Sequence, residues 1–339
     1  MVAARADADL VLEADDDALV GLLAGELSPE AALAKSAVAI VSGDPAEIDR
    51  FLELFRFADL CGRLRPGPAA YTCVVRTATS TSAIARRPRA FVRVAGPDAE
   101  DYLHRMLSND VAALAAGESC QALLLTPKAR VIAPLRVLRR GPDDFLLLTE
   151  PELGEALRAA LVRMRFAAKA EIELEEHTST LVFGAGAAEG IPNDDYGEAA
   201  VEVLDAELEP TLDADALEEL RIRAGTPRFG REIDDRVLPA EAGLVERAVS
   251  LTKGCYPGQE PIARLHYRGH ANRGLRVLAV EGEEVPEPEA ELRVGEKAVG
   301  RVTSAVRTED GIIALAYVRT EVPADAVLEA GRAKARSLH

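Results

Sequence analysis

The sequence predicts an α+β protein with more than one domain, on three observations. Between residues 90 and 224, strand-like apolar alternation and helix-like periodicity follow one another. From residue 275 onward the pattern contains short strands alone, which is typical of a small antiparallel barrel. Before both regions, glycine and proline gather at residues 62–68 and indicate a linker.

The first 60 residues are expected to form an α/β segment of their own. Alternation predicts a strand at residues 8–13, and a short apolar run predicts another at residues 35–43. Helix-start signals, an acidic cap or a proline in the first turn, predict helices at residues 15–25, 28–34 and 45–57. Residues 61–82 follow as the linker, with a short strand at residues 71–75.

Residues 83–272 are expected to be the main domain and residues 273–339 the barrel. In the main domain, the predicted strands are residues 90–94, 119–125, 130–138, 144–148, 170–175, 181–185 and 200–204, and the predicted helices are residues 99–107, 151–165 and 213–224. A loop at residues 225–244 follows the last helix. Five or so strands are expected in the barrel, at residues 275–281, 298–306, 312–318, 326–329 and 334–338.

Charge and cysteine content exclude several classes of protein. The 339 residues carry 40 Lys and Arg against 57 Asp and Glu, a net charge of −17, which disfavours a general nucleic-acid or anionic-membrane surface. The four cysteines show neither a CxxC pair nor the spacing of a zinc site or disulfide framework. The N-terminus lacks a signal pattern and no run of eighteen apolar residues occurs, so we expect a cytoplasmic protein that contacts neither membrane nor nucleic acid directly.

One stretch concentrates residues that carry chemistry: Lys253-Gly-Cys-Tyr-Pro-Gly-Gln-Glu260. The order Tyr256-Pro257-Gly258 predicts a tight turn, and Gly254 suggests that the backbone comes close to another group there. Lys253, two residues before Cys255, is expected to favour its thiolate, which makes Cys255 the best candidate nucleophile or metal ligand. The alternative is a buried structural cysteine in a tight connection.

Arginines follow this stretch in an otherwise acidic chain. Arg264, Arg268 and Arg273 are opposed locally by Glu260 alone, which predicts an anion-binding surface. The alternative, given equal weight, is a solvated face whose arginines pair with carboxylates elsewhere.

The KGCYPGQE stretch and the following YRGHANRGL resemble the YgfZ family of folate-binding proteins, which are relatives of the glycine-cleavage aminomethyltransferase. Softer matches at residues 91–98, 107–111, 221–230 and 238–241 extend the resemblance over roughly residues 85–335. The resemblance implies an aminomethyltransferase-like folate-binding core of two interleaved subdomains with a small C-terminal antiparallel β-barrel. The N-terminal residues resemble the C-terminal half of a sterol-carrier-type lipid-binding domain, from which no function is carried over.

The resemblance also implies tetrahydrofolate or a derivative in a central pocket, and a role in assembling or repairing iron–sulfur clusters in client enzymes, with Cys255 essential. A cluster takes several cysteine ligands, so contact with Cys255 alone is expected to be transient or shared with a partner. The implied partners are iron–sulfur enzymes or cluster carriers. The residues expected to contact the cofactor are Lys253, Gly254, Tyr256, Gly258, Gln259, Glu260, Arg264, Arg268, Asn109 and Arg223. For Asn109, a backbone-capping role is the alternative.

Two departures from the aminomethyltransferase pattern bear on activity. The resemblance implies acidic residues for one-carbon transfer at the positions that Ala133 and Pro134 occupy here, and neither of these can move a proton. It also implies a glutamate that reads the pterin at the position of Arg223, and a guanidinium cannot accept hydrogen bonds. We therefore expect a folate-binding accessory protein. An aminomethyltransferase-like enzyme is the first alternative and a non-catalytic lipid-binding or scaffold protein the second.

Overall fold

The computed structural model describes residues 10–14, 38–43, 71–75, 83–184 and 190–338, and the chain divides into two units, Met1–Thr81 and Ser82–His339. The first unit contains strands β1 (Leu10–Ala14), β2 (Val38–Gly43) and β3 (Tyr71–Val75), which form an antiparallel sheet in the order β2-β1-β3. Residues 71–75, grouped with the linker in the sequence analysis, thus pair with the first strand. The three helices expected in this unit lie outside the described residues.

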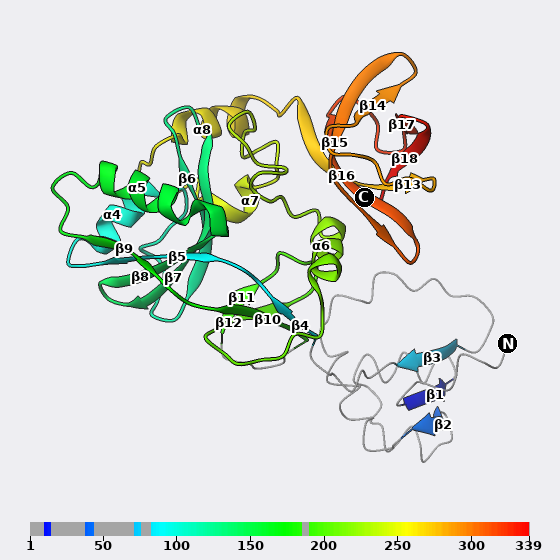
Figure 1. Ribbon diagram of the computed structural model, residues 1–339, viewed down its shortest axis with the longest axis horizontal. Coiled ribbons are helices and arrows are strands. Elements are labelled where there is room, and N and C mark those ends of the chain that lie inside the picture. Colours follow the sequence, from blue (N-terminus) through cyan, green and yellow to red (C-terminus); the bar gives the residue numbers. More distant parts are fainter. Residues whose placement is uncertain (1–9, 15–37, 44–70, 76–82, 185–189, 339) are drawn as a thin grey trace. The chain divides into compact units, whose positions relative to one another are not determined.

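The second unit contains a five-stranded antiparallel sheet (Figure 1). Its order is β6-β7-β8-β5-β9, from β5 (Ala90–Ala95), β6 (Ser119–Leu125), β7 (Val131–Gly141), β8 (Asp144–Thr149) and β9 (Glu171–Glu175). Alternate residues of β6 and β7 give the sheet two apolar faces. One of them packs with α4 (Ala99–Met106) and α5 (Gly154–Met164) in a core that includes Leu103, Phe145 and Leu157.

A second sheet interleaves with the first along the chain. It has the order β11-β12-β10-β4, from β4 (Ile84–Arg86), β10 (Ser179–Phe183), β11 (Ile191–Asn193) and β12 (Ala200–Leu204). Because β4 precedes the five-stranded sheet in the sequence and the other three strands follow it, the predicted interleaving of two subdomains is observed. The three-residue strands β4 and β11 were not expected, since so short a run shows no measurable alternation.

The remaining helices lie after the two sheets in the sequence. They are α6 (Ala214–Arg223), α7 (Val245–Ala248) and α8 (Gln259–Arg268), and a short 3₁₀ turn, Pro151–Leu153, precedes α5. As predicted, Asp213 caps α6, because its side chain accepts a hydrogen bond from the Ala216 amide at 2.8 Å. Among the described residues, no helix is both long and apolar enough to span a bilayer.

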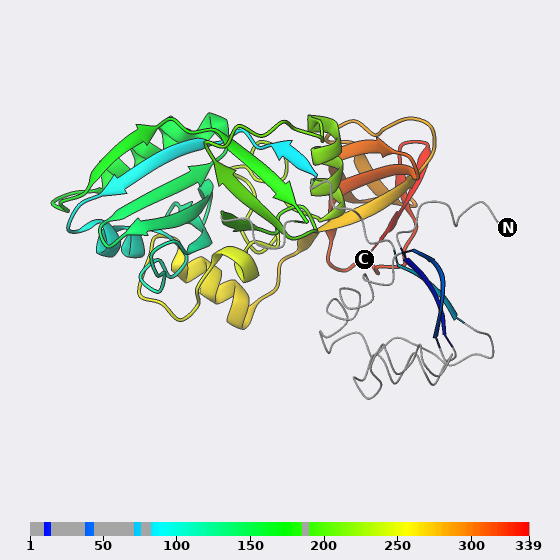
Figure 2. The same ribbon diagram turned by 90° about the horizontal axis from the view of Figure 1, so that it is seen from below.

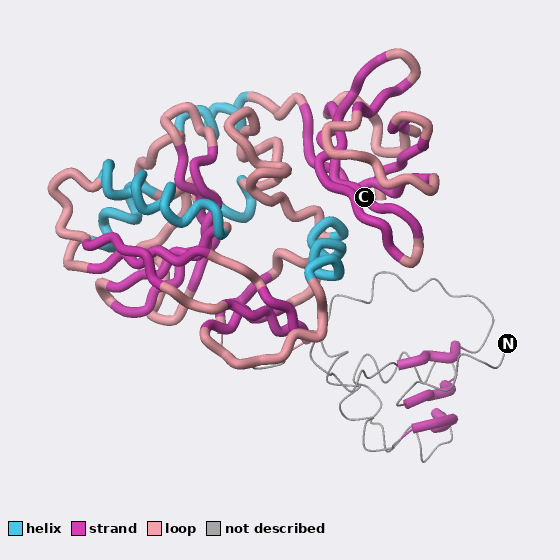
Figure 3. The backbone as a smooth tube through the Cα atoms, in the orientation of Figure 1, coloured by secondary structure: helices cyan, strands magenta, loops and turns pink. Residues whose placement is uncertain are grey.

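The C-terminal strands close into an antiparallel barrel (Figures 2 and 3). Its order is β13-β16-β15-β14-β17-β18, from β13 (Arg273–Glu281), β14 (Glu291–Val294), β15 (Lys297–Thr308), β16 (Gly311–Arg319), β17 (Leu328–Ala330) and β18 (Ala333–Ser337). The strand that sequence analysis missed is β14. Leu292 is its one buried residue, so its composition is that of a charged loop.

Tyr317 on β16 ties the barrel to the loop that follows α6. The ring is buried, and its hydroxyl donates a hydrogen bond to the Glu232 carbonyl at 2.8 Å. The guanidinium carbons of Arg273 and Arg301 lie 5.0 and 5.6 Å from the ring centroid. Ser304 on β15 donates to the Glu232 carboxylate at 2.7 Å, so one loop residue holds two barrel strands.

Candidate functional site

The motif loop, residues 253–258, is fixed at its start by Lys253. Its ammonium donates hydrogen bonds to the carbonyls of His104, of Leu107 at 2.7 Å and of Asn109 at 3.1 Å, all at or just beyond the end of α4. A cation is favoured there because a helix leaves its last carbonyls without partners. Burial lowers the pKa of Lys253 to about 8, so the amine stays mostly protonated at neutral pH.

Gly258 fixes the other end of the loop at the start of α8. Its φ of +85° is in the left-handed region, and a Cβ there would lie 2.7 Å from the Thr126 carbonyl oxygen in the turn between β6 and β7. Glycine is therefore required for two reasons: the backbone is in the left-handed region, and there is no room for a Cβ. Tyr256 is buried beside it, and burial raises the pKa of its hydroxyl to about 12.

Cys255 is exposed between these anchors. Three carbonyls accept the three protons of the Lys253 ammonium, so Lys253 offers the thiolate its charge but no hydrogen bond. That this charge favours the thiolate stays a prediction. The expected close approach at Gly254 is not observed among the protein's own atoms, since a Cβ would meet nothing nearer than the His104 ring at 3.9 Å. Burial raises the pKa of Cys120, the other described free cysteine, to about 11, so Cys255 remains the accessible thiol.

The arginines after the motif loop separate into two groups. Glu260, Arg264 and Arg268 line an open groove of about 390 Å³ along α8, where both arginines are exposed. Arg273 instead forms a bidentate ion pair with Glu241 at 3.0 and 3.1 Å. The predicted anion surface thus keeps two of its three arginines, and the alternative describes Arg273. Gln259 is half-buried in the first turn of α8.

Asn109 adjoins the motif loop through its carbonyl, which accepts from Lys253, whereas Arg223 lies on α6. The Asn109 side chain donates to the Gln121 carbonyl at 2.7 Å and accepts from the Asp110 amide at 2.9 Å, which is the capping alternative. Arg223 is part-exposed on α6 and pairs with Glu219 one turn earlier at 2.8 Å. Neither residue lines the central cavity described next, so neither is placed to contact a ligand there.

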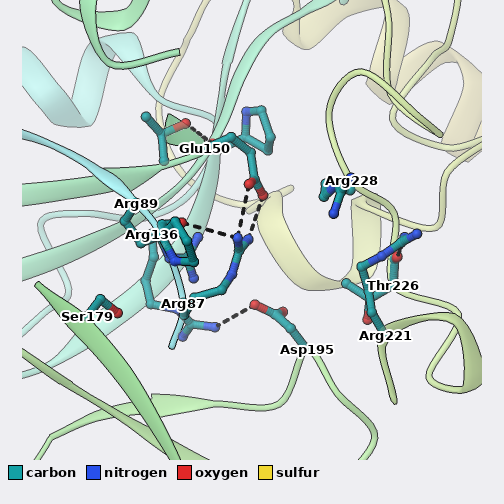
Figure 4. Close-up of polar contacts among 12 residues, drawn as sticks. Arg87, Arg89, Arg136, Glu150, Ser179, Asp195, Arg221, Thr226 and Arg228 are labelled. Atoms are coloured by element: carbon teal, nitrogen blue, oxygen red, sulfur yellow. Dashed lines mark hydrogen bonds and ion pairs between the residues drawn. The ribbon is translucent and has the colours of Figure 1, made fainter. Parts of the chain in front are cut away.

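The central cavity is an arginine-lined space of about 70 Å³ between the five-stranded sheet, the second sheet and the segment from α6 to α7. Its arginines come from four parts of the chain: Arg87, Arg89, Arg136, Arg221, Arg228 and Arg247. Figure 4 labels all of them except Arg247. Arg87 and Arg89 lie between β4 and β5, and Arg136 lies on β7. Such a concentration of guanidinium groups is suited to binding carboxylate or phosphate.

Most of these guanidinium groups already hold a carboxylate. Arg87 binds Glu150 at 2.6 and 3.1 Å, and Arg89 binds the fully buried Glu202 at 2.8 and 3.0 Å. Although burial alone would raise the pKa of Glu202, the Arg89 guanidinium and further hydrogen bonds lower it to about 2. These pairs build the walls of the cavity.

Comparison with known proteins shows the family of the chain. A protein of *Edwardsiella ictaluri* named tRNA-modifying protein YgfZ is 31% identical over 281 residues, which cover 70% of this chain and 84% of the relative. The chain belongs to the YgfZ family. The protein of the same name from *Shigella dysenteriae* is 26% identical over 74% of this chain and 89% of its own. An uncharacterised protein of Haemophilus influenzae is 29% identical over 238 residues, which cover 67% of this chain and 85% of that protein. No protein-family model matches the chain.

The structural comparison confirms the fold that the YgfZ resemblance implied. The solved structure of glycine cleavage system aminomethyltransferase T from *Bartonella henselae* matches with a TM-score of 0.66 over 76% of this chain and 85% of its own. At 20% identity this similarity is one of fold. The aminomethyltransferase-like core and the C-terminal antiparallel barrel are thus established.

In this YgfZ-family chain, the two positions without acids face opposite ways on β7. Pro134 lines the central cavity, whereas Ala133 is buried on the face that packs with α4 and α5. Pro134 is therefore the position that matters for chemistry in the cavity, and it offers no proton donor or acceptor side chain.

Sequence analysis missed most of the central cavity. Arg87, Arg89, Arg136, Glu150, Glu202 and Arg247 are scattered over more than 150 residues and form no local motif. One signal was available: Arg136 interrupts the apolar strand run Val131-Ile-Ala-Pro-Leu-Arg-Val137. A charge inside such a run points to a buried ionic or ligand contact.

Proposed function

We propose that this chain is a folate-binding accessory protein that supports iron–sulfur cluster assembly or repair in client enzymes through Cys255. The observation that carries the proposal is the position of the thiol. Cys255 is exposed on a loop fixed at both ends by Lys253 and Gly258, and it does not line the central cavity. A rigidly presented outer thiol suits contact with another protein better than chemistry on an enclosed small molecule.

The cargo of such a thiol is iron in a cluster. A thiolate is a good ligand for iron, and one thiolate cannot retain a whole cluster, so the contact is shared with the client or a cluster carrier. Two relatives are named tRNA-modifying protein YgfZ. This name supports the proposal that enzymes of tRNA modification are one class of client. With a net charge of −17, the chain is suited to act on such enzymes without binding nucleic acid itself.

The central cavity supports one half of a folate better than the other. Arg136 presents buried, unpaired donors, which fit the carboxylates of a glutamate tail. A pterin needs acceptors, yet the lining carboxylates Glu150 and Asp195 are already bound by arginines. The residues therefore fit the acidic end of tetrahydrofolate or a derivative, and no reaction step on the pterin follows from them. This also disfavours the aminomethyltransferase alternative, together with Pro134.

Complementation tests the role of Cys255. In cells that lack the protein, Cys255→Ser is expected to fail to restore the activity of a cluster-dependent enzyme, while the matched control Cys120→Ser restores it. Cys255→Ser should melt within about 2 °C of the wild type, because the Cys255 thiol is exposed. Cys120→Ser, which places a hydroxyl against the core, should melt lower and still complement. Full complementation by Cys255→Ser, or a failure explained by a collapsed melting temperature, would show that the thiol is structural. Calorimetry with tetrahydrofolate and folinic acid tests the folate half separately.

A further inference from the structure

Arg136 is the exceptional member of the cavity's arginines. It is 7% exposed, and among the described residues its Nε and one Nη find no hydrogen-bond partner. Each of the other five lining guanidinium groups donates to a carboxylate: Arg87, Arg89, Arg221, Arg228 and Arg247. Two aspartates lie within ion-pair distance of Arg136, Asp194 at 3.7 Å and Asp195 at 3.9 Å, but neither forms a hydrogen bond with it. Buried donors without a hydrogen bond are costly, and native proteins keep them where something else binds them.

A carboxylate already lies at the edge of this position. One oxygen of Asp195 accepts hydrogen bonds from both Gln121 and Arg247 at 2.8 Å. The other oxygen lies 3.9 Å from Arg136, and an oxygen of the exposed Asp194 lies 3.7 Å from it; both distances are too long for a hydrogen bond. Gln121 pairs directly with Arg136 across β6 and β7, so both side chains face the same space. The cluster therefore binds its own carboxylate incompletely, and its strongest donor is left over.

The size of the cavity selects among ligands. About 70 Å³ is several times the roughly 10–15 Å³ that one water requires, and it is well below the roughly 300 Å³ or more of sites that enclose larger ligands. A carboxylate or phosphate group fits such a space, whereas a bicyclic pterin does not fit without rearrangement of the walls.

We infer that the central cavity is an oxyanion site centred on Arg136, in which Asp195 competes with the ligand. The ligand is the carboxylate or phosphate group of a small molecule, bound by Arg136 together with Gln121 and Arg247 once Asp195 yields. Two sources carry this chemistry: the glutamate tail of a folate, which would then enter tail first, and a free anion such as inorganic phosphate. The inference concerns the ligand of the proposed function and is independent of Cys255.

Calorimetry on the full-length protein at constant ionic strength tests the site. The probes are inorganic phosphate, folinic acid, and formyltetrahydropteroate, which lacks the glutamate. Arg136→Gln should weaken binding of the bound anion by about tenfold or more, since it removes charged hydrogen bonds. Asp195→Asn should strengthen it, because the amide still accepts from Gln121 and Arg247 but no longer repels an anion. The control Arg336→Gln, an exposed barrel arginine, should leave affinity unchanged.

Calorimetry distinguishes a folate tail from a free anion, and it also shows whether the inference fails. Folinic acid binding without formyltetrahydropteroate binding identifies the folate tail, and phosphate binding alone identifies a free anion; either supports the site. Saturable binding of formyltetrahydropteroate that Arg136→Gln does not alter would overturn it, as would no binding of phosphate or folinic acid by the wild type or by Asp195→Asn. Because Cys255→Ser is not part of this experiment, failure here leaves the complementation result standing.

Discussion

Lys253 in the motif loop and Arg136 in the central cavity are both buried cations, but their surroundings are opposite. Three carbonyls surround the ammonium of Lys253, whereas two nitrogens of Arg136 have no partner among the described residues. A cation whose donors are all used holds a structure together, and one with donors to spare is available to bind. Lys253 therefore anchors the motif loop, whereas Arg136, which belongs to no sequence motif, is available to bind a ligand.

The largest expected effect is on the wall of the central cavity. Glu202→Gln leaves the Arg89 charge buried without its carboxylate, and we expect the free energy of unfolding to fall by roughly 3–5 kcal/mol. Urea unfolding followed by circular dichroism measures the change. A loss below about 1 kcal/mol would mean that the Arg89–Glu202 pair is solvated. The distinction between paired and unpaired arginines in the cavity would then not hold.

Acid should remove the same contribution in the wild type. The pKa of Glu202 falls from its ordinary 4.5 to about 2 on folding, so its stabilisation is complete above pH 4.5 and is lost as the pH falls toward 2. The difference in unfolding free energy between wild type and Glu202→Gln should therefore shrink by about 3 kcal/mol over that window. Chemical unfolding at a series of pH values measures it, and a difference independent of pH would contradict the bound carboxylate.

The two glycines of the motif loop should differ sharply. Gly258→Ala combines a strained left-handed backbone with a contact of 2.7 Å to a carbonyl oxygen, and roughly 2–3 kcal/mol of stability should be lost. In Gly254→Ala the new Cβ makes only an ordinary contact of 3.9 Å with the His104 ring, so stability should change by less than about 0.5 kcal/mol. Thermal melts of both variants provide the measurement. Equal effects would show that the loop is not anchored through Gly258.

The comparison of the two buried cations is tested directly by removing each. Lys253→Met leaves three carbonyls without a donor and should cost about 2 kcal/mol. Arg136→Gln removes no protein hydrogen bond and takes away a buried charge, so it should not lower the unfolding free energy. A larger loss for Arg136→Gln than for Lys253→Met, in parallel urea titrations, would reverse the roles given to them.

What could be predicted from sequence follows from the range of the interactions involved. Strands such as residues 119–125 and 144–148 were located within a residue because alternation is a local property. The motif loop was found for the same reason, but the anchoring role of Lys253 was not foreseen, since its carbonyl partners lie more than 140 residues earlier in the chain. Arg136 lies in one sheet and Asp195 follows a strand of the other. Local sequence patterns do not predict the strand order of these sheets, so the proximity of the two residues could not be predicted.

The contacts of Tyr317 have a consequence for how this unit melts. The Tyr317 hydroxyl donates to the Glu232 carbonyl, and the Ser304 hydroxyl donates to the Glu232 carboxylate. These buried hydrogen bonds join two barrel strands to the loop beside the cavity. Breaking them would expose a buried ring and a fully buried carboxylate at once. Cooperativity should therefore extend across residues 83–338, and the barrel should share a single calorimetric transition with the core instead of melting as an independent module.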